Sequence, residues 1–151
     1  MPTIVIKING DKTTEKKLRR LGGSLLDMSK AMRAVGNDFL GFYTDKPFTS
    51  QGGIYGSPWA ALKPATVDQK VKYNPTTATY PLIKSGKMRR SFKVESSSTH
   101  MRLFNTTDYF KYHQLGTKNM PQRMVLQLTK SRYDAVKRII EADIKDKINR
   151  A

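Results

Sequence analysis

The stretch LRRLGGSLLDMSKAMRAVGNDFLGF, residues 18–42, carries the most regular pattern in the chain. Its apolar side chains recur at alternating steps of three and four residues: Leu18, Leu21, Leu25, Met28, Met32, Val35, Phe39 and Phe42. This spacing predicts a helix over residues 14–42, about 43 Å long, with one apolar stripe. Such a stripe packs along a sheet of its own domain or against a neighbouring subunit, and the first arrangement is favoured. Gly22, Gly23 and Gly36 inside this helix predict a kink or a close backbone contact.

The flanking segments predict an α+β fold in one domain, residues 1–151. Residues 3–9 alternate apolar and polar side chains as a half-buried strand does. A small antiparallel sheet is expected to pack against the long N-terminal helix and a C-terminal helix, with a loop-rich insertion at about 44–80. Short helices are expected over 64–71 and 108–116, and a short basic helix or turn within 81–92. Strands are expected over 92–95, 100–104 and 124–128. A final helix is expected to open at Ser131, with an apolar stripe of Tyr133, Val136, Ile140, Ile144 and Ile148.

The charge balance is the strongest bulk feature. Lys and Arg number 28 and Asp and Glu 12, which gives a net charge of +16. Such a field favours nucleic acid, anionic membranes or acidic proteins as partners. The sequence has no apolar run long enough to span a membrane and no signal-peptide pattern, so we expect no membrane association. It also has no cysteine, which fits synthesis in a reducing cytoplasm.

Groups that could perform catalysis are sparse. The two histidines, His100 and His113, fit an exposed hairpin position and a packing position better than a catalytic base. His, Asp and Glu do not occur at metal-ligand spacing, and no nucleophile motif accompanies the serines. We therefore expect no enzymatic activity, no catalytic residue, no cofactor and no metal.

Residues 63–90 contain seven Lys or Arg residues and a single acid, Asp68. Lys87, Arg89 and Arg90 lie close enough along the chain to form one patch. Non-specific contact with phosphates needs only such a patch, whereas base recognition needs a motif that this chain does not contain.

Four segments occur in an order and spacing that resemble a known family. They are Trp59–Thr66 (W-x-x-L-x-x-x-T), Pro81–Ser91 (P-L-x-x-S-G-x-M-x-x-S), Tyr109–Gly116 (Y-x-x-x-H-x-x-G) and Pro121–Leu128 (P-x-R-x-x-L-x-L). In this order they resemble the phage virion morphogenesis and tail-completion family and, more distantly, the neck proteins of HK97-like phages. Two positions depart from the family pattern: Lys84 replaces the usual acid, and residues 72–80 form a loop of their own.

The resemblance implies a structural virion protein at the tail terminus or neck, assembled in the host cytoplasm as a ring, with six-fold symmetry expected. Its implied partners are further copies of itself and the tail tube or head–tail connector proteins, with possible non-specific contact to DNA in the channel. The alternative is a basic, non-sequence-specific DNA-binding or packaging accessory protein. The residues expected to contact a partner, a neighbouring subunit or DNA are Lys84, Lys87, Arg89, Arg90 and Arg123. Those expected to anchor the structure are Trp59, Leu62, Leu82, Gly86, Tyr109, His113 and Gly116.

Trp59 is the only tryptophan, and it lies in the loop-like sequence GSPWAALKPAT, residues 56–66. A tryptophan between two prolines is compatible with stacking on a ligand. Because Leu62 and the helix-opening Pro64 follow it closely, we expect it instead to hold the loop at residues 48–58 on the core. Truncation of Trp59 to Ala is then expected to impair folding first and assembly as a consequence.

Overall fold

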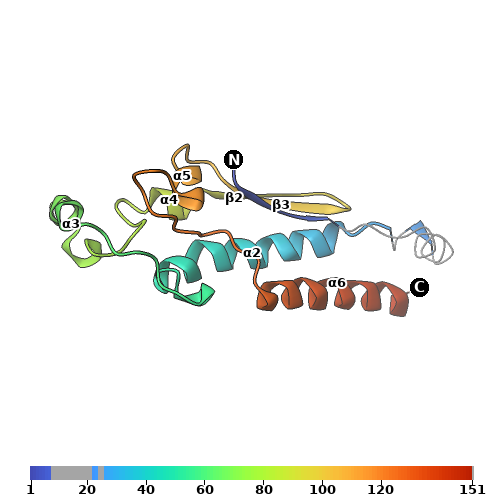
Figure 1. The fold of residues 1–151 in the computed structure, drawn as a ribbon. Coiled ribbons are helices and arrows are strands. Elements are labelled where there is room, and N and C mark those ends of the chain that lie inside the picture. Colours follow the sequence, from blue (N-terminus) through green and yellow to red (C-terminus); the bar gives the residue numbers. More distant parts are fainter. Residues whose placement is uncertain (8–21, 24–25, 151) are drawn as a thin grey trace. The chain divides into compact units, whose positions relative to one another are not determined.

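The computed structural model describes residues 1–7, 22–23 and 26–150. These residues form a mixed α+β fold with a three-stranded antiparallel sheet, as predicted (Figure 1). In chain order the elements are β1 (Thr3–Lys7), α2 (Ser29–Thr49), the 3-10 helix η2 (Gly53–Tyr55), α3 (Pro64–Val71), the 3-10 helix η3 (Pro75–Thr77), α4 (Lys87–Arg90), β2 (Phe92–Ser96), β3 (His100–Asn105), α5 (Phe110–Leu115) and α6 (Lys130–Arg150).

The chain divides into two compact units. Unit 1 comprises Met1–Thr3, Leu40–Lys93 and Phe104–Gln127, and unit 2 comprises Ile4–Phe39, Val94–Leu103 and Leu128–Ala151. Since α2 and the sheet contribute residues to both units, a single domain over residues 1–151 stays a prediction.

The sheet has the strand order β1-β3-β2. The predicted hairpin of β2 and β3 is confirmed, and the Ser97 N–H donates to the carbonyl of His100 at its turn (2.8 Å). Along β3 every second residue is buried: Met101, Leu103 and Asn105. This alternation is what a strand with one covered face requires.

In unit 2, the N-terminal part of α2 packs on the hairpin through its predicted stripe. Met32, Val35 and Phe39 are fully buried. Gly36 is the position of closest approach, because a Cβ atom there would lie 2.5 Å from Cγ1 of Val94. The sequence predicted a kink or a close backbone contact at the glycines, whereas the close neighbours of Gly36 are the side chains of Val94 and Met101.

Helices α2 and α6 run side by side and antiparallel in unit 2 (Figure 1). Lys30 near the start of α2 pairs with Asp146 near the end of α6 at 3.4 Å. Arg132 near the start of α6 pairs with Asp38 farther along α2 at 2.9 Å. The C-terminal helix was predicted to open at Ser131, but it starts one residue earlier. The helix begins at Lys130 because Thr129 caps it: the Thr129 hydroxyl accepts from the Arg132 N–H (3.3 Å).

The predicted continuous helix over residues 14–42 is wrong. Leu18, Leu21 and Leu25 lie outside the described residues. Gly22 has a φ of +101°, and residues 26–28 are not helical. The helix begins at Ser29 because the Asp27 carboxylate accepts from the Ser29 N–H (2.9 Å), while the Met28 N–H donates to the carbonyl of Ser98 in the hairpin turn (3.0 Å).

The helix also extends farther than predicted, to Thr49, into the segment expected to be irregular from residue 44. Pro47 lies in its last turns, where a missing N–H disrupts little of the remaining helix. Pro47 and Phe48 are fully buried, so tertiary packing outweighs the tendency of proline to end a helix. Phe48 packs edge-on against Phe92 of β2 (ring centroids 6.4 Å apart), and Phe92 packs against Phe110 of α5 (5.6 Å). This aromatic row lies within the core of unit 1.

Three short helices of unit 1 form where the sequence predicts them. Helix α3 spans Pro64–Val71, with proline at its first turn; α4 is the short basic helix within residues 81–92; α5 ends at Gly116.

The predicted strand over residues 124–128 is wrong, because this segment has no ladder partner and is irregular. Side chains bind its backbone instead. Gln114 bonds Val125 and Leu126, Trp59 donates to the Met124 carbonyl, and Tyr43 and Tyr55 donate to the carbonyls of Gln127 and Val125. These bonds satisfy backbone groups that a sheet would otherwise satisfy.

Candidate interaction surface

Residues from the first three of the four family-like segments line an open cavity of about 390 Å³ in unit 1. Helix α3, the loop before α4, α4 itself and the start of α5 contribute its lining. Leu62, Leu82, Ile83 and Met88 give it an apolar interior. Leu82 has a φ of +62°, in the left-handed region that a branched side chain rarely adopts. Backbone strain of this kind persists only where the surroundings hold it.

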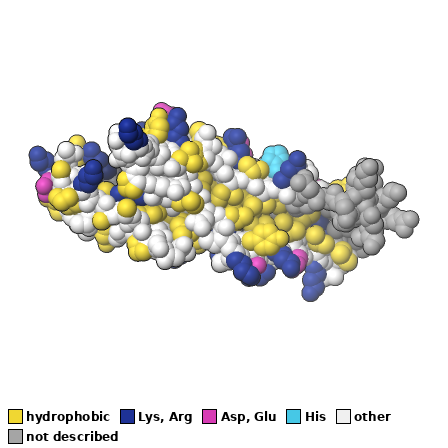
Figure 2. Space-filling model, viewed as in Figure 1, with side chains coloured by type: hydrophobic (Ala, Val, Ile, Leu, Met, Phe, Trp, Pro, Cys, Tyr) yellow, Lys and Arg dark blue, Asp and Glu magenta, His cyan; other side chains and the backbone are white. Residues whose placement is uncertain are grey.

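Three lysines line the same cavity. Lys84 and Lys87 are exposed, whereas Lys70 is 7% exposed and its ammonium donates to the carbonyl of Tyr80. Burial lowers the pKa of Lys70, and the nearby charges of Arg123 and Lys84 lower it further. Lys84 Nζ lies 4.2 Å from the ring centroid of Tyr73, a cation–π distance. Figure 2 shows that Lys and Arg also outnumber Asp and Glu on the visible face.

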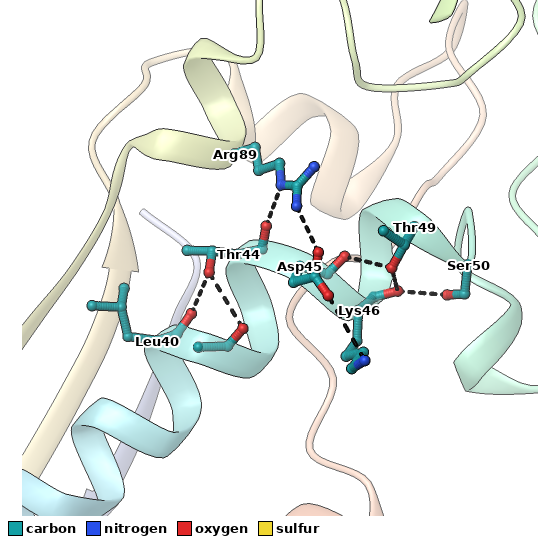
Figure 3. A network of polar contacts seen from close by, with 8 residues as sticks. Leu40, Thr44, Asp45, Lys46, Thr49, Ser50 and Arg89 are labelled. Carbon is teal, nitrogen blue, oxygen red and sulfur yellow. Dashed lines mark hydrogen bonds and ion pairs between the residues drawn. The ribbon is translucent and has the colours of Figure 1, made fainter.

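Arg89, expected to contact a partner, is bound internally (Figure 3). Its Nε donates to the carbonyl of Thr44 at 2.5 Å, and its Nη2 lies 2.6 Å from Oδ1 of Asp45. The Thr44 hydroxyl in turn donates to the carbonyl of Leu40 at 2.7 Å. Because both partners of the ion pair are more than a third exposed, the pair itself adds only about 0–1 kcal/mol. Its consequence is geometric: α4 is tied to the C-terminal part of α2.

Arg90 folds back over the turn that precedes α4. Its Nη2 donates to the carbonyl of Ser85 at 2.9 Å. A Cβ atom at Gly86 would lie 2.5 Å from Nη1 of Arg90, and Gly86 has a φ of +74°. Glycine at position 86 thus provides both the left-handed backbone and the space for the guanidinium.

Arg123 is 5% exposed and connects the first and fourth family-like segments. Its Nε donates to the carbonyl of Ala60 at 2.9 Å and its Nη2 to that of Ala61 at 3.2 Å. Its backbone N–H donates to the carbonyl of His113 at 2.8 Å. Burial lowers the pKa of Arg123, and the carbonyl dipoles compensate its charge in place of an acid.

Trp59 is half-buried and bonded at two points. Its backbone N–H donates to the carbonyl of Gln51 at 2.7 Å, and its indole Nε1 donates to the carbonyl of Met124 at 2.9 Å. Its ring packs edge-on against Phe48 at 5.9 Å and covers Gly52, where a Cβ atom would lie 2.4 Å from the indole Cδ1. Trp59 therefore connects the end of α2, the loop after it and the irregular segment at residues 124–128.

Tyr109 and His113 of the third segment face each other edge-on at 6.2 Å and both line the cavity. The Nδ1 atom of His113 is buried without a hydrogen-bond partner among the described residues. Burial lowers the pKa of His113, and the charge of Arg123 lowers it further. Gly116 ends α5 with a φ of +74°, and a Cβ atom there would lie 3.0 Å from the backbone nitrogen of Gln122.

The sequence analysis missed Gln114, which is 7% exposed and lies in the third segment. Its side chain makes three hydrogen bonds to the backbone of residues 125 and 126. One signal was present: Gln114 follows Phe110 by four residues, so it shares the buried face of α5 with that aromatic side chain. Tyr43 and Tyr55 were also missed.

The structure thus brings Lys84 and Lys87 together with Leu62, Leu82, Gly86, Tyr109 and His113 at one cavity. Arg89, Arg90 and Arg123 bind backbone carbonyls of the chain, and their predicted contacts with a partner, a neighbouring subunit or DNA stay predictions. Within residues 1–7, 22–23 and 26–150, no group of three or more His, Asp or Glu side chains could hold a metal ion. No helix in the same part of the chain has the length and apolar character to span a membrane.

Comparison with known protein families gives one match. The model of the phage virion morphogenesis family matches residues 10–145. Searches of curated proteins and of solved structures gave no match.

Proposed function

Because the chain belongs to the phage virion morphogenesis family, we propose that it completes or terminates the phage tail, or joins tail to head at the neck, as a subunit of a ring. The family itself gives a role in phage particle assembly. The position in the particle, the ring and the partners are our proposal.

The convergence of family-like segments on one cavity supports this proposal. Residues from the second and third segments line it beside α3, and Arg123 and Trp59 connect the first segment to the fourth. Most of these side chains hold irregular backbone in fixed positions, while Lys84 and Lys87 are left at the surface. A rigid frame that presents a charged, partly apolar surface suits docking to another protein.

Assembly of the purified protein tests the proposal. Negative-stain microscopy and mass photometry should show rings, either for the protein alone or after tail tubes are added. The variant Lys84→Glu/Lys87→Glu should remain folded, by circular dichroism, and lose association. The matched control Lys118→Glu/Lys145→Glu makes the same change of charge at two other exposed lysines and should keep it.

A protein that stays monomeric and never joins tails or connectors would contradict the proposal. Binding to duplex DNA with a steep salt dependence, together with absence from particles, would favour a DNA-binding accessory role instead.

A further inference from the structure

The cavity beside α4 combines two kinds of surface that suit a particular class of ligand. Its interior is apolar, with Leu62, Leu82 and Met88 among the lining side chains. Its volume of about 390 Å³ is at the lower end of the range for ligand sites, so it accommodates one or two side chains rather than a folded surface. A small apolar cavity of this type receives an anchor side chain from a partner.

The charge around the cavity has one sign. Lys70, Lys84 and Lys87 line it, and none of the described residues that line it is Asp or Glu. Lys84 and Lys87 are exposed, and the Lys84 ammonium rests on the Tyr73 ring, a contact that leaves its other side open to an anion. The Lys70 ammonium already donates to the Tyr80 carbonyl. Complementarity therefore selects a ligand that carries negative charge next to its apolar group.

We propose that the cavity binds an acidic segment of a partner protein, in which an apolar side chain is flanked by carboxylates. The apolar side chain occupies the interior beside Leu82, and the carboxylates pair with Lys84 and Lys87. This inference deepens the proposed function, on which it rests, by naming the chemistry of the partner. A nucleic-acid backbone is the poorer fit because phosphates need only the cations and leave the apolar interior unfilled.

The strained backbone of Leu82 supports a binding role for this position. A left-handed conformation is unfavourable for a residue with a Cβ atom, whereas glycine adopts it freely. Leu82 nevertheless occupies it at the cavity, and its side chain remains only half-buried in the free protein. An apolar side chain held at such a cost and left partly uncovered gains its remaining contacts from a ligand.

Fluorescence anisotropy with labelled synthetic peptides tests the inference. The probe set consists of seven-residue peptides with a central Leu, Met or Phe flanked by Asp and Glu, the same peptides with a central Ala, and the same peptides with Asn and Gln flanks. We expect the acidic peptides with an apolar centre to bind at least tenfold more tightly than either control set. The variant Lys84→Gln/Lys87→Gln should weaken binding at least tenfold, and Lys118→Gln/Lys145→Gln should leave it unchanged.

A second variant separates the apolar contact from charge. Leu82→Gly relieves the left-handed strain, so the protein stays folded, and it should lower affinity for the apolar-centred acidic peptides at least fivefold. Equal binding of Leu-centred and Ala-centred peptides would overturn the apolar part of the inference. A 20-base-pair duplex that binds through Lys84 and Lys87 while none of the acidic peptides binds would overturn it entirely.

The inference and the proposed function can fail separately. Rings that enter particles normally while no acidic peptide binds would refute the inference alone. Peptide binding by a protein that never enters particles would refute the proposed function alone.

Discussion

Replacement of Gln114 by Met removes three hydrogen bonds and keeps an unbranched side chain of similar length. Nε2 of Gln114 donates to the Leu126 carbonyl at 2.7 Å, and its Oε1 accepts the N–H groups of Val125 and Leu126 at 2.8 and 2.9 Å. All three residues are buried. A hydrogen bond contributes about 1 kcal/mol net, and a buried polar group left without a partner costs about 1–3 kcal/mol. We expect Gln114→Met to lower the free energy of unfolding by about 3–5 kcal/mol.

Thermal unfolding followed by circular dichroism measures this loss. For a chain of this size 1 kcal/mol corresponds to about 2–4 °C, so the midpoint should fall by about 6–20 °C. The control Gln69→Met replaces an exposed glutamine on α3 and should change the free energy of unfolding by less than about 0.5 kcal/mol. If the free energy of unfolding of Gln114→Met lies within 1 kcal/mol of the wild-type value, the Gln114 side chain does not hold residues 124–128 in their conformation.

Three further predictions concern the same unit. Gly52→Ala should lower stability by at least 1 kcal/mol more than Gly56→Ala in urea titrations, because both positions have a positive φ but only at Gly52 would the new Cβ meet Trp59; equal losses would contradict the steric argument. Trp59→Phe removes the bond to the Met124 carbonyl and leaves a smaller ring, so it should cost at least about 1–3 kcal/mol in the same assay, and a stability equal to that of the wild type would contradict the role of this bond. Since burial lowers the pKa of His113, its contribution to stability is present above about pH 6.5 and is lost as the pH falls, because the unfolded chain takes up the proton first. His113→Gln should therefore make the free energy of unfolding depend less on pH between about pH 5 and 7. An unchanged pH dependence would show that His113 is not the group responsible.

The elements that the sequence predicts correctly are those with a local signal. Helix α3 begins with a proline at its first turn, α5 ends at a glycine, and the hairpin alternates around a serine-rich turn. Each signal lies within a few residues of the element that it determines. The cavity contacts of Lys84 and Lys87 likewise follow from a motif that is contiguous in the chain.

The errors occurred where distant residues decide the local structure. Residues 124–128 have the apolar composition of a strand, but side chains from residues 43, 55, 59 and 114 satisfy their backbone groups. The start of α2 depends on Met28 bonding Ser98, 70 positions away, and its end on the burial of Pro47. A heptad-like pattern contains no information about either contact, so it predicted a helix that starts and ends too early.

The arginines and the lysines of the basic segment at residues 84–90 have different roles. Arg89 and Arg90 have planar guanidinium groups that donate to backbone carbonyls at fixed angles, and both are used to hold the turn and helix around Gly86. Lys84 and Lys87 carry compact charges on flexible side chains and remain exposed at the cavity. We therefore expect a change of charge at position 84 to leave the arginine-bound frame intact and, on the proposed binding of an acidic segment, to alter which partner segment the cavity accepts.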